Sequence, residues 1–371
     1  MFKYLRYFGT HVLVWSATIG FLAGGSWYWL GLAVGVVGWM GGDALSLKLD
    51  PEPPIYKRRY VLDLACYSLF PSLVLMCVVF AWALSPGDLL GIGALVETRF
   101  GWNTLAAKAA ATSSDYWGAS YSYGLAIAMG GILTAHELTH RTSDGLAMWL
   151  GRWMLAMAFN ASLATAHVFG HHLDVATPAD PATARRGESI YYFFMRSTVG
   201  QVFQAWRIES ERLRALGASN IYLQNRVFHG FLRSGLVAGL FFAAGGWLAL
   251  GIFLLAAVWS KLLLESLNYM EHYGLVREPG SPIEARHSWD SDRAFCQAAL
   301  FNLPYHADHH HRAGVQYPEL VRDETAPQLA QGYLATVPIV LMPPLWQRLM
   351  APKLEEWDRD RASDAERALV G

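Results

Sequence analysis

The feature that most constrains this chain is a stretch of 35 residues, from Phe8 to Gly42, that contains no Asp, Glu, Lys or Arg. A helix that crosses a membrane needs about 20 consecutive, mostly apolar residues. The stretch is long enough for two short spans, and Gly24 and Gly25 are the natural place for the chain to turn. Charged residues make up only 16% of the chain, against about 25% in soluble domains. The sequence therefore predicts an integral membrane protein.

Three further apolar regions extend this prediction to six spans. They cover residues 61–84, roughly residues 116–135, and a pair within residues 227–264 that turns at Gly245 and Gly246. We expect an all-α membrane protein with a histidine-rich cytoplasmic cap. In this scheme residues 1–135 form helices one to four, residues 136–226 a cytoplasmic segment, residues 227–268 helices five and six, and residues 269–371 a second cytoplasmic segment, all within one functional domain.

Basic residues predict the orientation of these spans. They gather before the first span, after the second span and after the fourth span, and such segments face the cytoplasm. Both termini are therefore expected in the cytoplasm of a bacterial-type inner membrane, and the first apolar run is too long for a cleaved signal peptide. Residues 153–166 and 333–346 are apolar over only about 14 positions, which is typical of core, re-entrant or interfacial segments. The net charge of −1 provides no electrostatic basis for binding nucleic acid. Cys66, Cys77 and Cys296 lack metal-ligand spacing and are expected to be free thiols.

Nine of the 13 histidines fall into four tight groups that this topology places on the cytoplasmic side. The groups are HELTH with His136 and His140, HVFGHH with His167, His171 and His172, NYMEHYGL with His272, and HADHH with His306, His309 and His310. HELTH alone matches the H-E-x-x-H pattern of zinc proteases. Nine imidazoles are too many for one ion, however, and the pattern predicts two ions with four or five imidazoles each.

The choice of metal follows less directly from the residues. Imidazole suits iron, copper, nickel and zinc, and carboxylate-bridged di-iron bundles draw on Glu as well as His. The grouped residues are overwhelmingly His, which favours a histidine-rich di-iron site without a carboxylate bridge. Spacing alone does not choose iron over zinc.

The four groups resemble those of the integral-membrane di-iron alkane monooxygenases, which belong with the xylene-type methyl hydroxylases and, more distantly, the membrane fatty acid desaturases. The segments TPADPATARRGESIYYF, HSWDSD and PPLWQRLMAPKL are similar to further signature segments of that family. The resemblance implies two non-haem iron ions bound by all nine grouped histidines. The H-x-x-H-H spacing leaves His311 outside this set, and His287 is expected to be either structural or a further ligand. His11 and His229 lie in apolar surroundings and are expected to be ordinary buried histidines.

Carboxylates near the ligands are expected to orient the imidazole rings. The candidates are Glu137, Asp180, Glu188, Glu271 and Asp308. Each has the alternative of a solvated loop acid or an ion-pair partner. Glu137 would be the general base of a zinc protease, whereas here we expect it to hold a ring or a neighbouring arginine.

The resemblance implies insertion of one oxygen atom from O2 into a terminal methyl group, which converts an n-alkane into a primary alcohol. The sequence has no nucleotide-binding glycine pattern, flavin motif or cysteine cluster, so electrons must come from another protein, such as a rubredoxin or a [2Fe–2S] ferredoxin and its reductase. The docking face for this electron donor is one expectation for Arg185, Arg186, Arg207, Arg212 and Arg214, and ordinary solvation of a surface helix is the alternative.

The sequence leaves the branch of the family, and hence the substrate, open. Ala166 stands where the alkane branch usually has an acidic residue, and the C-terminal segment is more similar to the xylene-type branch, whose substrates are alkyl-arenes. The segments NYMEHYGL and TPADP, in contrast, are more similar to the alkane branch. A fatty acyl desaturase, a membrane zinc hydrolase and a metal transporter are the remaining alternatives.

Overall fold

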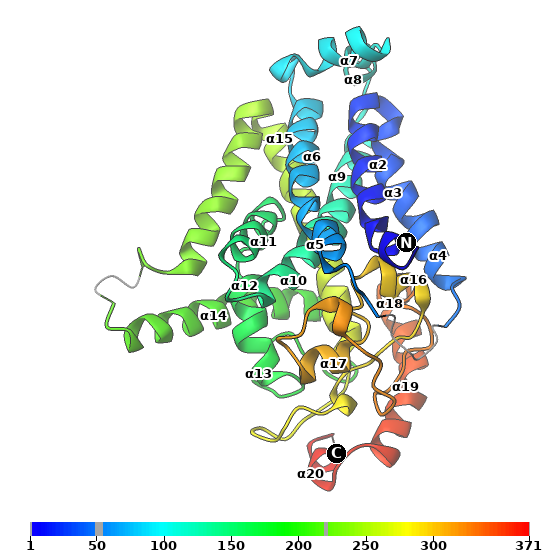
Figure 1. Cartoon of the computed structure of the whole chain (residues 1–371), viewed down its shortest axis with the longest axis vertical. Coiled ribbons are helices and arrows are strands. Elements are labelled where there is room, and N and C mark those ends of the chain that lie inside the picture. Colours follow the sequence, from blue (N-terminus) through cyan, green and yellow to red (C-terminus); the bar gives the residue numbers. More distant parts are fainter. Residues whose placement is uncertain (1, 49–54, 219–221, 371) are drawn as a thin grey trace. The chain divides into compact units, whose positions relative to one another are not determined.

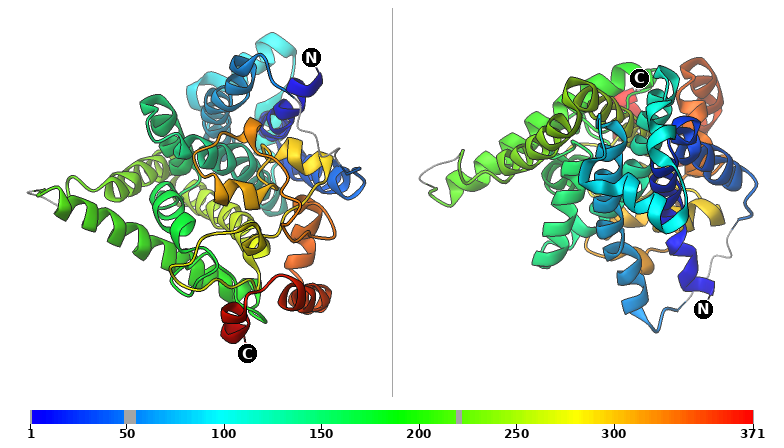
Figure 2. Two further views of the ribbon diagram at one scale, coloured as in Figure 1. Left: turned by 60° about the horizontal axis from the view of Figure 1, so that its bottom comes forward. Right: turned by 90° about the horizontal axis from the view of Figure 1, so that it is seen from above.

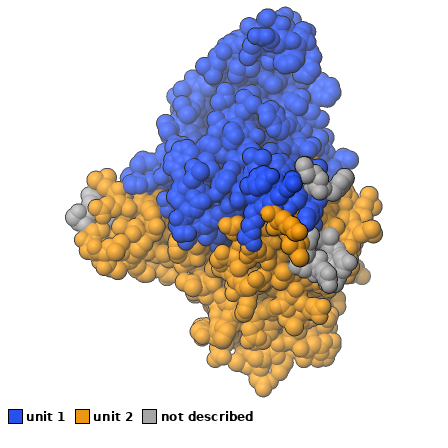
Figure 3. Space-filling view, in the orientation of Figure 1, with its two compact units in different colours: residues 1–38, 58–161, 228–261 blue, residues 39–57, 162–227, 262–371 orange. Residues whose placement is uncertain are grey.

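The computed structural model describes residues 2–48, 55–218 and 222–370, and all regular secondary structure in these ranges is helical (Figure 1). Contacts divide the chain into two compact units. Unit 1 comprises residues 1–38, 58–161 and 228–261, and unit 2 comprises residues 39–57, 162–227 and 262–371 (Figure 3).

Unit 1 contains most of the apolar helices. They are α1 (Phe2–Leu5), α2 (Gly9–Ala23), α3 (Leu30–Ala33), α5 (Arg59–Tyr67), α6 (Leu69–Leu84), α7 (Ile92–Phe100), α8 (Thr104–Ala109), α9 (Ser113–Ile127), α10 (Leu133–His140), α11 (Gly145–Met157) and the larger part of α15 (Arg226–His272). Helices α2, α6 and α9 pack against one another (Figures 1 and 2).

The glycine pairs interrupt the apolar stretches where the sequence predicts turns. Helix α2 ends at Ala23, and Gly24 and Gly25 both have positive φ, a conformation that glycine adopts without steric cost. Helix α15 is broken at Gly245 and Gly246, where φ is −149° and 64°. The rings of Phe241 and Phe253 stack at 4.4 Å between their centroids, which requires the chain to fold back on itself between them. Both predicted turns are confirmed.

Two helical stretches in the described residues are long and apolar enough to cross a membrane by length and composition. They are Arg59–Leu84 and Arg226–His272, each with a mean hydropathy of 2.2 over an 18-residue window. The other expected spans fall on shorter helices, since α2 and α9 have 15 residues each. The count of six spans therefore stays a prediction. The three cysteines are free thiols, as expected.

Unit 2 carries most of the histidines on short helices. Its helices are α4 (Gly41–Ala44), α12 (Leu163–Ala166), α13 (His172–Asp174), α14 (Ile190–Ala215), the end of α15, α16 (Ala294–Ala299), α17 (His306–His311), α18 (Tyr333–Val340), α19 (Pro343–Asp360) and α20 (Asp364–Val370). A π-helical turn, His167–His171, joins α12 to α13.

Buried carboxylates secure the helices of unit 2. Asp43 accepts a hydrogen bond from the Ala335 N–H in the first turn of α18 at 2.9 Å, so a residue distant in sequence caps this helix. Glu209 of α14 binds the guanidinium groups of Arg212 and Arg226 at 2.7 and 2.8 Å. Burial would raise the pKa of Glu209, but the hydrogen bonds from these two arginines outweigh it and lower the pKa to about 2.

Candidate metal centre

A buried group of four imidazoles forms in unit 2 from three of the four sequence motifs. Its members are His171, His272, His306 and His310, and one potential ligand atom of each lies within 4.8 Å of the others. His306 Nε2 lies 3.1 Å from His272 Nε2 and 3.1 Å from His310 Nε2. A neutral imidazole carries a single N–H, so His306 cannot donate to both neighbours. A cation between the nitrogens would resolve this convergence of lone pairs.

Hydrogen bonds outside the group fix the protons of two rings. His171 Nδ1 lies 2.8 Å from Asp180 Oδ2, and His272 Nδ1 lies 3.0 Å from the carbonyl oxygen of His287. Both acceptors lack a proton, so each Nδ1 carries the hydrogen and each Nε2 keeps its lone pair. The Nε2 of His171 is buried and has no hydrogen-bond partner among the described residues. A bound metal ion would supply the partner that such a buried atom requires.

The charge states suit metal binding. Burial, reinforced by the imidazoles of His172 and His306, holds the pKa of His310 well below its ordinary value, and a metal ligand must be neutral imidazole. Burial alone would raise the pKa of Asp180. The His171 imidazole and hydrogen bonds from Thr183 and the Ala182 N–H outweigh burial and lower that pKa, so the carboxylate is ionised.

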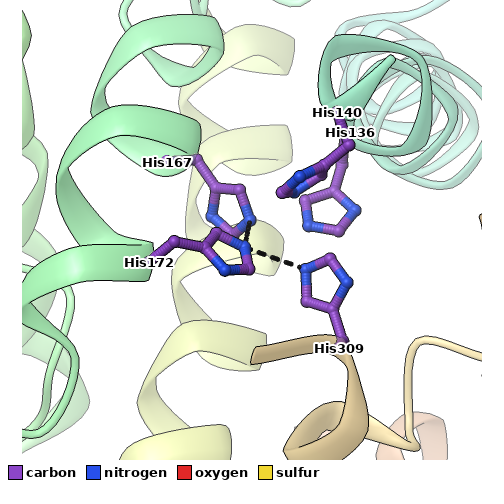
Figure 4. Close-up of side chains that lie close together, drawn as sticks. All are labelled: His136, His140, His167, His172 and His309. Atoms are coloured by element: carbon purple, nitrogen blue, oxygen red, sulfur yellow. Dashed lines mark hydrogen bonds between the residues drawn. The ribbon is translucent and has the colours of Figure 1, made fainter. Parts of the chain in front are cut away.

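Three further imidazoles of unit 2 converge separately from this group. His172 Nε2 lies 3.0 Å from His167 Nε2 and 3.1 Å from His309 Nε2. Figure 4 shows these contacts as dashed lines and also draws His136 and His140. In unit 1, His136 and His140 lie one turn apart on α10, with ring centroids separated by 4.9 Å.

Local helix geometry explains why neighbouring histidines join different groups. A π-helical turn closes its hydrogen bond at residue i+5, so the turn at residues 167–171 brings His167 and His172 together and directs His171 elsewhere. In α17, His306 and His310 are four residues apart and share a face. His309 points to another face and contacts His172.

The donor atoms of these groups are all imidazole nitrogens, and neighbouring ring nitrogens lie 3.0 and 3.1 Å apart. Imidazole is a suitable ligand for iron, copper, nickel and zinc. The residues present would therefore fit iron, and the donor set by itself does not distinguish iron from the other three metals.

The remaining histidines lie outside these groups. Both ring nitrogens of His287 are engaged, with Nδ1 accepting from the Glu284 N–H at 3.0 Å and Nε2 lying 2.7 Å from Glu366 Oε1. His287 therefore acts through its carbonyl oxygen, which holds His272. His311 is exposed, and His11 Nε2 lies 2.8 Å from Ser68 Oγ. His229 belongs to neither group of potential ligands.

The five candidate carboxylates have different partners. Asp180 contacts His171, and Glu271 Oε2 lies 3.4 Å from His306 Nε2. Glu137 binds the guanidinium of Arg141 at 3.0 Å, one of the two contacts expected for it. Glu188 and Asp308 bind arginines, which is the ion-pair alternative expected for each of them. Their partners are Arg196 and Arg312, respectively, and Asp308 lies on α17 among the grouped histidines.

Sequence reasoning missed three residues that hold the ligands in place. Asp290 Oδ1 accepts from the Ala307 N–H at 2.8 Å and so caps α17 from outside. Glu366 of α20 binds the His287 ring. Arg277 donates to the carbonyl oxygens of Val175 and Leu173 at 2.9 and 2.7 Å. The signature segment HSWDSD contains Asp290, but its sequence did not indicate that Asp290 supports α17.

Two of the five arginines expected to form a docking face are paired within the chain. Arg186 binds Asp358 at 2.6 Å, and Arg212 binds Glu209. Arg185, Arg207 and Arg214 are exposed. A separate cavity of about 600 Å³ reaches His172 and is lined by Asp174, Thr177, Pro178 and Arg277 among others.

The chain is similar in sequence to known proteins. Residues 113–338 match the family model described as fatty acid desaturase, which is more than half of the chain. Alkane 1-monooxygenase 1 of Pseudomonas aeruginosa is 37% identical over 252 residues, covering 65% of this chain and 66% of the relative. Alkane 1-monooxygenase 2 of Alcanivorax borkumensis is 34% identical over 237 residues, covering 62% of each protein. The chain thus spans slightly less than two thirds of the length of these two relatives.

A third relative aligns along almost the whole chain. The xylene/toluene monooxygenase hydroxylase component XylM of Pseudomonas putida is 31% identical over 379 aligned positions, covering 99% of this chain and 93% of the relative. Because the family model covers more than half of the sequence and this relative covers nearly all of it, the chain belongs to the fatty acid desaturase family, in the group that contains the alkane 1-monooxygenases and the xylene/toluene monooxygenase hydroxylase component.

Proposed function

We propose that this protein is a membrane-bound non-haem di-iron monooxygenase that hydroxylates the terminal methyl group of a hydrophobic hydrocarbon, with an n-alkane as substrate and a 1-alkanol as product. The observation that carries the proposal is the convergence of His171, His272, His306 and His310 within unit 2, and separately of His167, His172 and His309, in a chain related to alkane 1-monooxygenases. Bound iron would supply the activation of O2. The protein residues supply neutral nitrogen ligands and hold their orientation.

The proposed ligand set divides the nine histidines between two ions. His171, His272, His306 and His310, which converge within unit 2, would hold one ion. We propose that the other five grouped histidines, His136, His140, His167, His172 and His309, would hold the second ion. The divided contacts of HVFGHH and HADHH support this assignment. We expect His310→Ala and His309→Ala each to reduce the iron content by about one ion per chain, because each removes a ligand of a different ion. Unchanged iron in both variants would contradict the assignment.

We further propose an inner-membrane location with six spans and both termini in the cytoplasm. The two long apolar helical stretches and the two turns at glycine pairs support this topology. Cysteine-accessibility mapping of the loops in intact cells tests it. Labelling of the loop at residues 101–112 from the periplasm, and of residues 141–144 only from the cytoplasm, is the expected result.

A separate electron-transfer protein, either a rubredoxin or a [2Fe–2S] ferredoxin, would complete the reaction. The cavity that reaches His172 supports an approach of the donor to a ligand ring from outside the protein. Reconstitution with each donor in turn tests this part of the proposal, with substrate-dependent oxidation of the reduced donor as the readout.

A second candidate function is hydroxylation of a methyl group on an alkyl-arene. Alignment with XylM over 99% of this chain favours it, since the matches to the two alkane monooxygenases cover 65% and 62%. Cells that express the protein with a rubredoxin or ferredoxin system should be fed n-octane, hexadecane, toluene and p-cymene in parallel. Products should be identified by mass spectrometry after growth under ¹⁸O₂.

The products distinguish the candidates. A labelled 1-alkanol supports the main proposal, and a labelled benzylic alcohol without alkanol supports the second. An alkene without any alcohol would indicate a desaturase and overturn both. Zinc without iron, together with activity in the absence of O2, would indicate a hydrolase.

A further inference from the structure

The first half of α14 carries apolar side chains on two opposite faces. One face is buried within unit 2 and includes Ile190 and Phe193. The opposite face consists of Tyr192, Met195, Val199 and Phe203, which are 50–71% exposed. Spacings of three and four residues place these four side chains in one line along the helix. We call them the α14 stripe.

A second exposed apolar surface adjoins the stripe at the start of α19. Met342, Leu345 and Leu349 are 40–48% exposed, while Trp346 and Met350 on the other face of the helix are buried. The hydroxyl of Tyr191 donates to the carbonyl oxygen of Leu341 at 2.8 Å. The beginning of the α14 stripe is thereby tied to the beginning of the α19 surface.

Seven large apolar side chains on one surface are unusual for a face exposed to water, and such patches mark contacts with proteins or membranes. We propose that the α14 stripe and the start of α19 lie on the membrane surface, with their side chains in the headgroup region of the lipid. Interfacial helices typically insert an apolar face about 5–10 Å into this region. Tyrosine is enriched at that depth because its ring is apolar and its hydroxyl is polar.

Charge at the edges of this surface supports lipid as the occupant. Arg207 lies one turn beyond Phe203, and Arg348 lies between Leu345 and Leu349 in sequence, and both arginines are exposed. Arginines at the border of an apolar helix face bind anionic lipid headgroups. The second half of α14 is charged instead, with exposed Glu211 and Arg214, so the apolar face ends where the charged face begins.

The position of the stripe in the chain also favours the membrane. Ten residues separate the end of α14 from the start of α15, which is apolar enough to span a bilayer. Ten extended residues reach at most about 35 Å. The stripe is therefore tethered close to the proposed point of membrane entry. This inference rests on the membrane location proposed above.

The experiment uses the full-length protein in liposomes that contain anionic lipid. Single cysteines replace Met195, Phe203 and Leu345 and carry an environment-sensitive fluorophore. Glu211→Cys on α14 and Glu356→Cys on α19 are matched controls, since both positions are exposed on the charged parts of the same helices. The labelled parent chain gives the background from the native thiols. Quenching by iodide in water and by lipids spin-labelled near the headgroup is then compared.

We expect lipid quenching at Met195, Phe203 and Leu345 to exceed that at the controls by at least about twofold, with weaker iodide quenching, because interfacial side chains lie near the headgroups. Equal quenching at these three positions and at the control positions would overturn the proposal. Weaker iodide quenching that appears only after addition of an electron-transfer protein would also overturn the proposal and would indicate a protein partner. Weaker iodide quenching only at a high protein-to-lipid ratio would overturn it as well and would indicate a second copy of the chain. Flotation of the liposomes separately shows whether the protein is membrane-embedded, and hydroxylation by the labelled variants separately tests the proposed function.

Discussion

Asp180 offers a direct test of how the four-histidine group binds metal. Its side chain is completely buried, and its Oδ2 accepts hydrogen bonds from His171 Nδ1 at 2.8 Å and from Thr183 Oγ1 at 2.7 Å. The other oxygen accepts from the Ala182 N–H at 3.0 Å. The exchange Asp180→Asn keeps the size of the side chain, removes its negative charge, and replaces one acceptor oxygen with a donor NH2 group.

Two effects follow from this geometry. An amide can present its oxygen either to His171 and Thr183 or to Ala182. Either orientation therefore places the NH2 group against a donor, at a cost of about 1–3 kcal/mol in folding free energy. Loss of the charged acceptor behind a metal-binding imidazole typically weakens metal binding or activity by about 10- to 100-fold. That corresponds to about 1.4–2.8 kcal/mol of binding free energy.

The assay is metal retention against a competing chelator, measured as iron per chain by mass spectrometry. Asp174→Asn is the matched control, because it makes the same chemical change in the same segment, where the carboxylate accepts a long hydrogen bond of 3.4 Å from the Gln204 side chain. We expect Asp180→Asn to release about one ion per chain at chelator concentrations that leave the control loaded. Equal retention by the two variants, with both chains folded, would refute the reasoning.

Three other predictions test the supports of unit 2. Glu366→Gln should lower iron retention with little change in KM. The reason is that the Glu366 carboxylate holds the ring of His287, whose backbone carbonyl oxygen orients the proposed ligand His272. Glu366→Asp should restore part of the retention. Gly332→Ala should destabilise the fold by about 1–3 kcal/mol, since its Cβ would lie 2.0 Å from Asp43 Oδ1, whereas Gly314→Ala meets no atom within 4 Å and should be neutral in the same denaturation assay. Glu209, with a pKa lowered from 4.5 to about 2, should contribute stability that is complete above pH 4.5 and lost as the pH falls towards 2. A Glu209→Gln variant that unfolds with the same pH dependence as the parent would show that this carboxylate does not contribute to the pH dependence of stability.

Local sequence patterns predicted much of this protein because the responsible forces act over a few residues. The turns at the glycine pairs follow from conformational freedom at two adjacent positions, and the all-helical fold follows from long apolar runs. The histidine groups were visible because residues four apart share a helix face. The same local reasoning could not show which of the candidate docking arginines are paired within the chain, as Arg186 and Arg212 are with Asp358 and Glu209.

Tertiary structure alone decided how the histidines are partitioned and supported. A sequence shows that His171 and His172 are adjacent, but only the π-helical turn separates them into different groups. The carbonyl oxygen of His287 supports His272, which lies 15 residues away in the sequence. Glu366 in turn supports the ring of His287 from a distance of 79 residues in the sequence. Residue identity determines which side chains can bind a metal, whereas the direction of each nitrogen lone pair depends on hydrogen bonds that exist only when distant segments pack together.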